Sequence, residues 1–122
     1  MIYPETKLII GDNCGAKRVK CLKIFKFSKS SGAKPMSLAV VSVRKVKNSK
    51  RIIKGEICRG VLIRLKKMIQ RDTGLSISFS DNSIILVDLK SIPIGNRVYG
   101  PIFKEFRFGD YPKLLSLAKT LV

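Results

Sequence analysis

The sequence contains no histidine and no tryptophan, and only 8 of its 122 residues are acidic. Histidine is the commonest general base at neutral pH, so its absence also removes any Ser–His or Cys–His nucleophile pair. The few carboxylates are scattered along the chain and form no cluster that could supply acid–base chemistry instead. We therefore predict that the chain is not an enzyme.

Cysteine is also scarce and has no metal-binding pattern. Cys14, Cys21 and Cys58 are odd in number and lack C-x-x-C spacing. Without histidine to complete the set, a tetrahedral zinc site would be short of ligands. We predict three reduced thiols in a reducing compartment, with no metal ion and no other cofactor.

Long apolar runs are missing as well. No stretch approaches the ~20 apolar residues of a membrane span, and residues 1–5 show no charged-then-apolar signal pattern. The basic residues do not gather on one face of an amphipathic helix, as they do in many proteins that bind membrane surfaces. We expect no secretion and no membrane partner.

Positive charge is what the sequence has in excess. Lys and Arg number 25 against 8 Asp and Glu, a formal net charge of +17, in a chain that is 45% hydrophobic. A disordered basic tail would be less apolar, so a folded domain is indicated. Between Lys17 and Arg71 lie 18 of the 25 basic residues, with Glu56 as the sole acid. This asymmetry favours a docking surface for a polyanion over a general solubility device.

Three strands are predicted in the second half of the chain. In residues 61–66, aliphatic side chains alternate with Arg64 and Lys66, which predicts a half-buried strand with one cationic face. Residues 75–80 alternate apolar side chains with serine and predict a second strand of the same kind. Residues 84–87 are continuously apolar, which is typical of a strand covered on both faces.

Further strands are predicted at residues 7–11, 17–27 and 38–46. In the second of these, the alternation slips phase near Leu22, which indicates a bulge or a barrel bend. Such a bend suits a sheet that closes on itself.

A short helix is predicted at the C-terminus, where apolar residues recur at helical spacing. Asp110 can cap it, and Pro112 suits its first turn. We predict a single domain over residues 1–122, with a barrel over about 1–100 and a C-terminal loop and helix over about 101–122. The predicted fold class is mainly β: a small antiparallel β-barrel, OB-like in kind, with a short helical C-terminal region.

Several ordered motifs together resemble one family. The central signature consists of Gly60, Val61, Leu62, Ile63, Gly74, Phe79, Asn82, Ile85 and Leu86. Residues 12–16, 94–101, 104–107 and 116–118 add matching segments in the same order. Together they resemble the universal ribosomal protein family numbered fourteen in the large subunit, over nearly the whole chain. The departures, which suggest a divergent member, are Cys14 for Ser, Pro35-Met36 for a Gly-Asp turn, Thr73 for Asp, Asn or Ser, and Ile85 for Val.

The resemblance implies a structural constituent of the large ribosomal subunit, which binds large-subunit rRNA and contributes to the intersubunit interface in translation. It further implies contacts with neighbouring large-subunit ribosomal proteins, with small-subunit rRNA through an intersubunit bridge, and with a ribosome-silencing factor. By motif match, the partner-facing and bridge-facing residues are Asn96, Arg97 and Lys113.

The basic residues are candidates for RNA contact. Duplex RNA offers phosphates and 2′-hydroxyls, whereas its base edges lie in a deep groove. The aromatics are few and lie mostly in apolar runs, which argues against stacking of single-stranded bases. The alternative, a free-standing basic β-barrel that binds nucleic acid, would require exposed aromatics on a strand face. The predicted RNA-binding residues are Lys17, Arg18, Lys20, Arg44, Lys45, Lys47, Lys50, Arg51, Lys54, Arg64, Lys66, Lys67 and Arg71.

The sequence also bears on the ribosome that would hold the chain. Its Lys- and Ile-rich divergence, the altered loop at residues 28–36 and the lack of a targeting segment favour a mitochondrial, organelle-encoded protein. A compact bacterial lineage would give a similar sequence, and a plastid is the third possibility.

Overall fold

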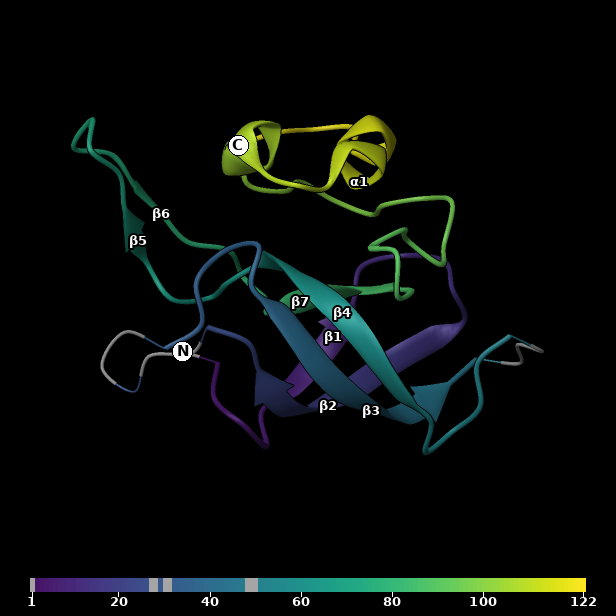
Figure 1. Cartoon of the computed structure of the whole chain (residues 1–122). Helices are drawn as coiled ribbons and strands as arrows, with labels where there is room; N and C mark the ends of the chain where they lie inside the picture. The colour runs from purple at the N-terminus through teal and green to yellow at the C-terminus, as the bar shows by residue number, and fades with distance from the viewer. Residues whose placement is uncertain (1, 27–28, 30–31, 48–50) are drawn as a thin grey trace.

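The computed structural model describes residues 2–26, 29, 32–47 and 51–122. Among these, five strands close a barrel in the order β1-β2-β3-β4-β7, and β5 pairs with β6 in a separate two-stranded sheet. Figure 1 shows the C-terminal segment, in yellow, lying over one end of the barrel. The predicted fold class is confirmed. The elements are β1 (Lys7–Ile10), β2 (Ala16–Ile24), β3 (Leu38–Val46), β4 (Ile57–Arg64), β5 (Ile69–Gln70), β6 (Ser76–Ile77), β7 (Ser83–Val87), the 3-10 helix η1 (Lys104–Phe108) and the helix α1 (Pro112–Leu117).

The barrel is antiparallel except where it closes. β1 pairs antiparallel with β2, β2 with β3, β3 with β4 and β4 with β7, whereas β1 and β7 pair in parallel. The bend predicted near Leu22 is confirmed as a register shift in the β2–β3 ladder between Cys21 and Lys23. A bulge of this kind increases local twist and allows a long strand to follow the closing sheet.

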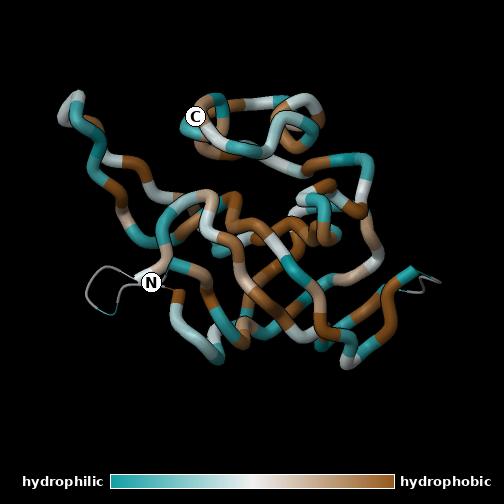
Figure 2. The backbone as a smooth tube through the Cα atoms, viewed as in Figure 1, coloured by the Kyte–Doolittle hydropathy of each residue, from teal (hydrophilic) through white to brown (hydrophobic). Residues whose placement is uncertain are grey.

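The end of β4 and the whole of β7 are buried on both faces. Residues 60–65 and every residue of β7 are buried, so the prediction for residues 84–87 is confirmed. The half-buried strand with a cationic face predicted for residues 61–66 is wrong. Alternation of apolar and polar residues predicts a strand with one buried face. Here the second face is buried too, because Phe103, Phe106 and other residues from later in the chain join the same apolar cluster as Leu62. Figure 2 shows apolar segments, in brown, gathered where β4 and β7 pass through the centre.

Residues 75–80 form a strand only at β6, so the prediction of a strand along the whole run is wrong, although Ile77 and Phe79 are half-buried between exposed serines as the alternation predicts. Instead β5 and β6 form a short hairpin that projects from the barrel in Figure 1, and Leu75 near its turn is 61% exposed. Phe79 anchors the base of the hairpin by packing edge-on against Phe103, with ring centroids 4.9 Å apart. Ile69 and Ile77 are half-buried and also pack against the core, whereas Leu75 at the far end of the hairpin is not covered.

The C-terminal segment returns to the barrel through apolar contacts. Ile102 and Leu114 are fully buried, and Ile102 forms a parallel bridge with Leu121. α1 has proline in its first turn, as predicted, but its N-cap is Tyr111 and no side chain makes a capping hydrogen bond. The prediction that Asp110 caps the helix is therefore wrong. No helix in the described ranges is long and apolar enough to cross a membrane.

Candidate nucleic-acid interface

Exposed cations gather where β2 begins and β3 ends. Arg18 is the register partner of Lys45 across the β2–β3 ladder. Like charges directly opposite each other weaken strand pairing by up to about 1 kcal/mol, and an anion bound across both strands would relieve that repulsion. We call this surface the β2–β3 basic cluster; its exposed members are Lys17, Arg18, Arg44, Lys45 and Lys47.

The connection from β3 to β4 extends the cluster. Arg51 and Lys54 are exposed there, whereas the predicted contact Lys50 lies outside the described residues. Gly55, at φ +88°, makes the turn that leads into β4. Lys54 is thus presented by a tight turn beside the end of β3.

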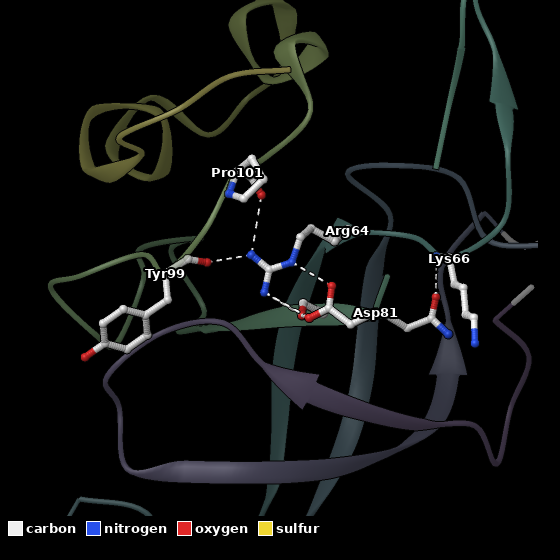
Figure 3. A network of polar contacts seen from close by, with 7 residues as sticks. Arg64, Lys66, Asp81, Tyr99 and Pro101 are labelled. Carbon is white, nitrogen blue, oxygen red and sulfur yellow. Dashed lines mark hydrogen bonds and ion pairs between the residues drawn. The ribbon is translucent and has the colours of Figure 1, made fainter. Parts of the chain in front are cut away.

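Arg64, predicted to contact RNA from an outward face, is buried, with 8% of its surface exposed. Its Nε and Nη2 donate to the two Asp81 carboxylate oxygens at 3.0 and 3.2 Å, and Nη2 also donates to Ser83 Oγ at 2.8 Å. Nη1 donates to the backbone carbonyls of Tyr99 and Pro101 at 2.5 and 3.4 Å (Figure 3). With its donors turned inward, Arg64 joins three segments of the protein and is not available to phosphate.

Asp81 supplies the counter-charge for Arg64. Partial burial opposes its ionisation, but hydrogen bonds from Arg64 and Ser83 and the charge of Arg64 outweigh that effect and lower the pKa of Asp81 from 3.8. The carboxylate is therefore ionised at neutral pH, and the contact is a true ion pair.

Two more of the predicted RNA-binding residues are paired with acids. Lys20 forms an ion pair with Glu5. Arg71 donates from Nε and Nη2 to Glu105 at 2.7 and 3.0 Å, and from Nη2 to the Val122 carbonyl at 2.6 Å. Partial burial opposes ionisation of Glu105, yet its hydrogen bonds and the nearby charge of Arg71 lower its pKa. Arg71 therefore ties the hairpin to the C-terminal segment.

Lys66 and Lys67 follow the buried end of β4. Lys66 is exposed, and its backbone N–H donates to Asn82 Oδ1 at 2.8 Å, which fixes the chain at that point. Lys67 is half-buried. The predicted RNA contacts that the structure leaves exposed are Lys17, Arg18, Arg44, Lys45, Lys47, Arg51, Lys54 and Lys66.

The segment carrying Asn96 and Arg97 is held by the turn after β1. Asn13 Oδ1 accepts the backbone N–H groups of Asn96 and Arg97 at 2.9 and 3.1 Å, and Asn13 Nδ2 donates to Asn96 Oδ1. Tyr99 N–H donates to the Gly11 carbonyl at 2.8 Å. Sequence reasoning missed this role of Asn13, although an Asp-Asn turn is where a side chain typically bonds backbone.

The two glycines that flank this segment allow close packing. A β-carbon on Gly95 would lie 2.7 Å from Asn13 Oδ1, and one on Gly100 would lie 2.6 Å from Arg64 Nη1. Gly100 also has φ +77°, a left-handed conformation, whereas Gly95 does not require one.

Lys113 is exposed on α1, apart from the 95–100 segment in the chain. Among the described residues, no hydrogen bond joins it to Asn96 or Arg97. The structure presents all three predicted partner-facing residues to solvent, two of them on one segment and the third on α1.

The turn after β1 also contains a buried acid and a buried thiol. Asp12 is 6% exposed, and its Oδ1 accepts the Cys14 N–H at 3.2 Å. Burial raises the pKa of Asp12, and burial together with Asp12 raises the pKa of Cys14 to about 12. Burial also raises the thiol pKa values of Cys21 and Cys58. Thiols this reluctant to ionise are poor nucleophiles and poor metal ligands.

A family model described as Ribosomal protein L14p/L23e matches residues 1–122, the whole chain. The chain belongs to this family. An L14p/L23e protein has a structural role in the large ribosomal subunit, which implies association with rRNA and other ribosomal proteins. The family is of a structural, non-enzymatic kind.

Proposed function

We propose that this L14p/L23e chain binds large-subunit rRNA through the β2–β3 basic cluster, extended by Arg51, Lys54 and Lys66. The observation that carries the proposal is the Arg18–Lys45 register pair, two exposed cations whose Cα atoms are partners across a ladder that shifts register on both sides of Arg18. All 8 acids of the chain could neutralise at most 8 of the 25 cations. The remaining positive charge can be neutralised by phosphate groups bound at the surface.

The strands favour recognition of the RNA backbone. None of the described strands contains an aromatic residue. A free-standing barrel that stacks single-stranded bases would need aromatics on a strand face, so this alternative is disfavoured. Phosphate and 2′-hydroxyl contacts to folded RNA fit a cationic surface of lysine and arginine better.

Salt dependence tests this proposal. The affinity of the isolated protein for a large-subunit rRNA fragment should fall steeply with salt, at about 0.7 to 0.9 log units per phosphate contact for each log unit of salt. The Arg18→Gln/Lys45→Gln variant should lower that slope. The matched control is Lys104→Gln/Lys119→Gln, which removes two exposed cations from the C-terminal segment. A wild-type slope near zero, or the same loss in both variants, would contradict the proposal.

We further propose that Asn96, Arg97 and Lys113 contact other proteins and the intersubunit bridge. The partners would be small-subunit rRNA in an intersubunit bridge, a neighbouring large-subunit protein and a ribosome-silencing factor. Support comes from family membership, from the exposure of all three residues, and from the Asn13 hydrogen bonds that hold the first two in place.

Finally, we propose that the ribosome is mitochondrial. The Lys- and Ile-rich divergence and the altered loop at residues 28–36 support this over a bacterial or plastid ribosome. Mass spectrometry of large subunits purified from mitochondria and from the other compartments of the source cells tests it. Recovery with non-mitochondrial subunits only would refute it, and recovery as free protein would revive the free-standing alternative.

A further inference from the structure

A surface pocket of about 400 Å³ lies between the turn after β1 and the 95–100 segment. Its walls include the ring-bearing Tyr99, the exposed aliphatic Ile9, and the two cations Lys17 and Lys47. A volume in this range is ordinary for sites that bind small organic ligands. None of the RNA contacts proposed above requires an aromatic residue, so they do not explain why Tyr99 lines this pocket.

We propose that the pocket takes one unpaired nucleotide of an RNA, with its base stacked on Tyr99 and an adjoining phosphate held by Lys17 and Lys47. The proposal rests on the rRNA binding proposed above and adds to it a specific preference for a base that has left its helix. Bases splayed out of folded RNA are commonly stacked on aromatic side chains.

Tyr99 combines an exposed ring with a backbone held by hydrogen bonds. Its side chain is 53% exposed although its backbone is held on both sides. Its N–H donates to Gly11 at 2.8 Å, and its carbonyl accepts from Arg64 Nη1 at 2.5 Å. Figure 3 shows the ring directed away from Arg64 and its network. Because the backbone is already ordered, stacking a base on the ring costs little additional conformational entropy.

The charges at the pocket suit a nucleotide. Lys17 and Lys47 are exposed, and Lys47 is held beside the turn because its N–H donates to the Gly15 carbonyl at 2.8 Å. The carboxylate in the wall, Asp12, is 6% exposed, and its Oδ1 accepts the Cys14 N–H, so its oxygens have little direct contact with a group that enters the pocket. A protein partner is less well matched, since lysine is depleted from the cores of protein interfaces.

Binding to two matched RNAs tests the pocket. The first is a fully paired RNA duplex, and the second is the same duplex with one bulged adenosine. Wild type should prefer the bulged duplex by about 5- to 150-fold, the range expected for one base stacked on an aromatic ring. Tyr99→Phe should keep this preference. Tyr99→Leu should abolish it while leaving affinity for the paired duplex unchanged.

The matched control is Phe108→Leu, because Phe108 is an aromatic residue on η1 that is 90% exposed but lies outside the pocket. It should leave the preference intact. Equal wild-type affinity for the two duplexes, or a preference that survives Tyr99→Leu or is lost in Phe108→Leu, overturns the pocket and leaves the proposed function standing. Failure of wild type to bind either duplex removes both proposals.

Crosslinking in assembled particles separates RNA from protein as the occupant. A photoreactive benzoylphenylalanine in place of Tyr99, in purified large subunits, should crosslink to an unpaired rRNA nucleotide. Crosslinking to a ribosomal protein, or to a base-paired nucleotide, overturns the proposal.

Discussion

Arg64 and Asp81 form a two-point ion pair at the end of β4, with Nε to Oδ1 at 3.0 Å and Nη2 to Oδ2 at 3.2 Å. Ser83 supports the pair by donating its hydroxyl to Asp81 at 2.8 Å. Because Arg64 also donates to carbonyls of residues 99 and 101, the same side chain fixes the segment that presents Arg97. A residue that sequence analysis assigned to RNA is thus central to the fold.

Replacing Arg64 with methionine should destabilise the protein by about 3 to 5 kcal/mol, because it leaves the Asp81 carboxylate unpaired in a partly buried site. Urea unfolding followed by circular dichroism measures this change. Arg59→Met, at an exposed position of the same strand, is the control and should change stability by less than about 0.5 kcal/mol. Equal losses of stability in the two variants would show that the hydrogen bonds of Arg64 do not stabilise the fold more than an exposed arginine does.

Stability should fall in acid. The pKa values of Asp81 and Glu105 are lowered from 3.8 and 4.5, so the unfolded chain binds protons more readily than the folded one in this range. Their contribution is complete above the unfolded values and is lost as the pH falls through the folded values. Urea unfolding in a series of buffers from neutral pH downward should show this decline.

Two variants check the assignment of the acid response. Asp81→Asn should make the decline shallower, because one of the titrating groups is gone. Asp12 has a raised pKa, so its contribution has the opposite sign: it is present at low pH and lost as the pH rises through the folded value. Asp12→Asn should therefore steepen the decline. Parallel curves for wild type and both variants would contradict the assignment.

Substitution of three glycines by alanine distinguishes the cost of a left-handed backbone from the cost of a steric contact. Gly74→Ala should cost about 1 to 2 kcal/mol, because Gly74 has φ +83° and nothing lies within 4 Å of the added β-carbon. Gly100→Ala should cost more, since it adds a contact of 2.6 Å with Arg64 Nη1 to a φ of +77°. Gly95→Ala has no cost of left-handed backbone, and its effect should come from the contact with Asn13. Thermal unfolding ranks the three variants. Equal losses of stability at Gly74 and Gly100 would show that the Arg64 side chain moves away from the added β-carbon at no cost.

Asn13→Ala should loosen the 95–100 segment without unfolding the barrel, because it removes the acceptor of the Asn96 and Arg97 N–H groups. Hydrogen exchange should accelerate at these two amides and stay unchanged in β3. Asn13→Asp, which keeps the acceptor, is the control and should retain protection. Unchanged exchange at residues 96 and 97 in Asn13→Ala would rule out the clamp.

Charge reversal separates the two proposed faces. Glutamate at Arg44, Lys45 and Arg51 would set like charge against phosphate, at about 4 kcal/mol per contact of ~4 Å before screening by salt. This variant should be missing from purified large subunits by mass spectrometry. Glutamate at Arg97 and Lys113 should leave incorporation intact but weaken joining to the small subunit, measured by sedimentation at graded magnesium. Equal loss of incorporation, or unaltered joining in the second variant, would contradict the two-face assignment.

Much of the barrel could be predicted because the signals for it are local. The bounds of β3, the bend near Leu22, the buried run at residues 84–87 and proline in the first turn of α1 all follow from neighbouring side chains. The same locality explains the failures. Residues 61–66 and 75–80 have similar alternation, yet the first became a strand buried on both faces and the second one arm of a projecting hairpin. Distant parts of the chain cover both faces of the first run, but they contact only Ile77 and Phe79 in the second.

The sequence by itself determined the excess of positive charge, its concentration between Lys17 and Arg71, and the motifs of the family. These properties depend only on which residues occur and in what order, and not on how the chain folds. Tertiary structure decided which cations remain exposed. Arg64 and Arg71 lie in the same basic region as Arg18 and Lys45, but carboxylates 17 and 34 residues away in the chain turn them inward. Such pairings depend on which distant segments the closed barrel brings together, and no local pattern of charge or hydrophobicity records them.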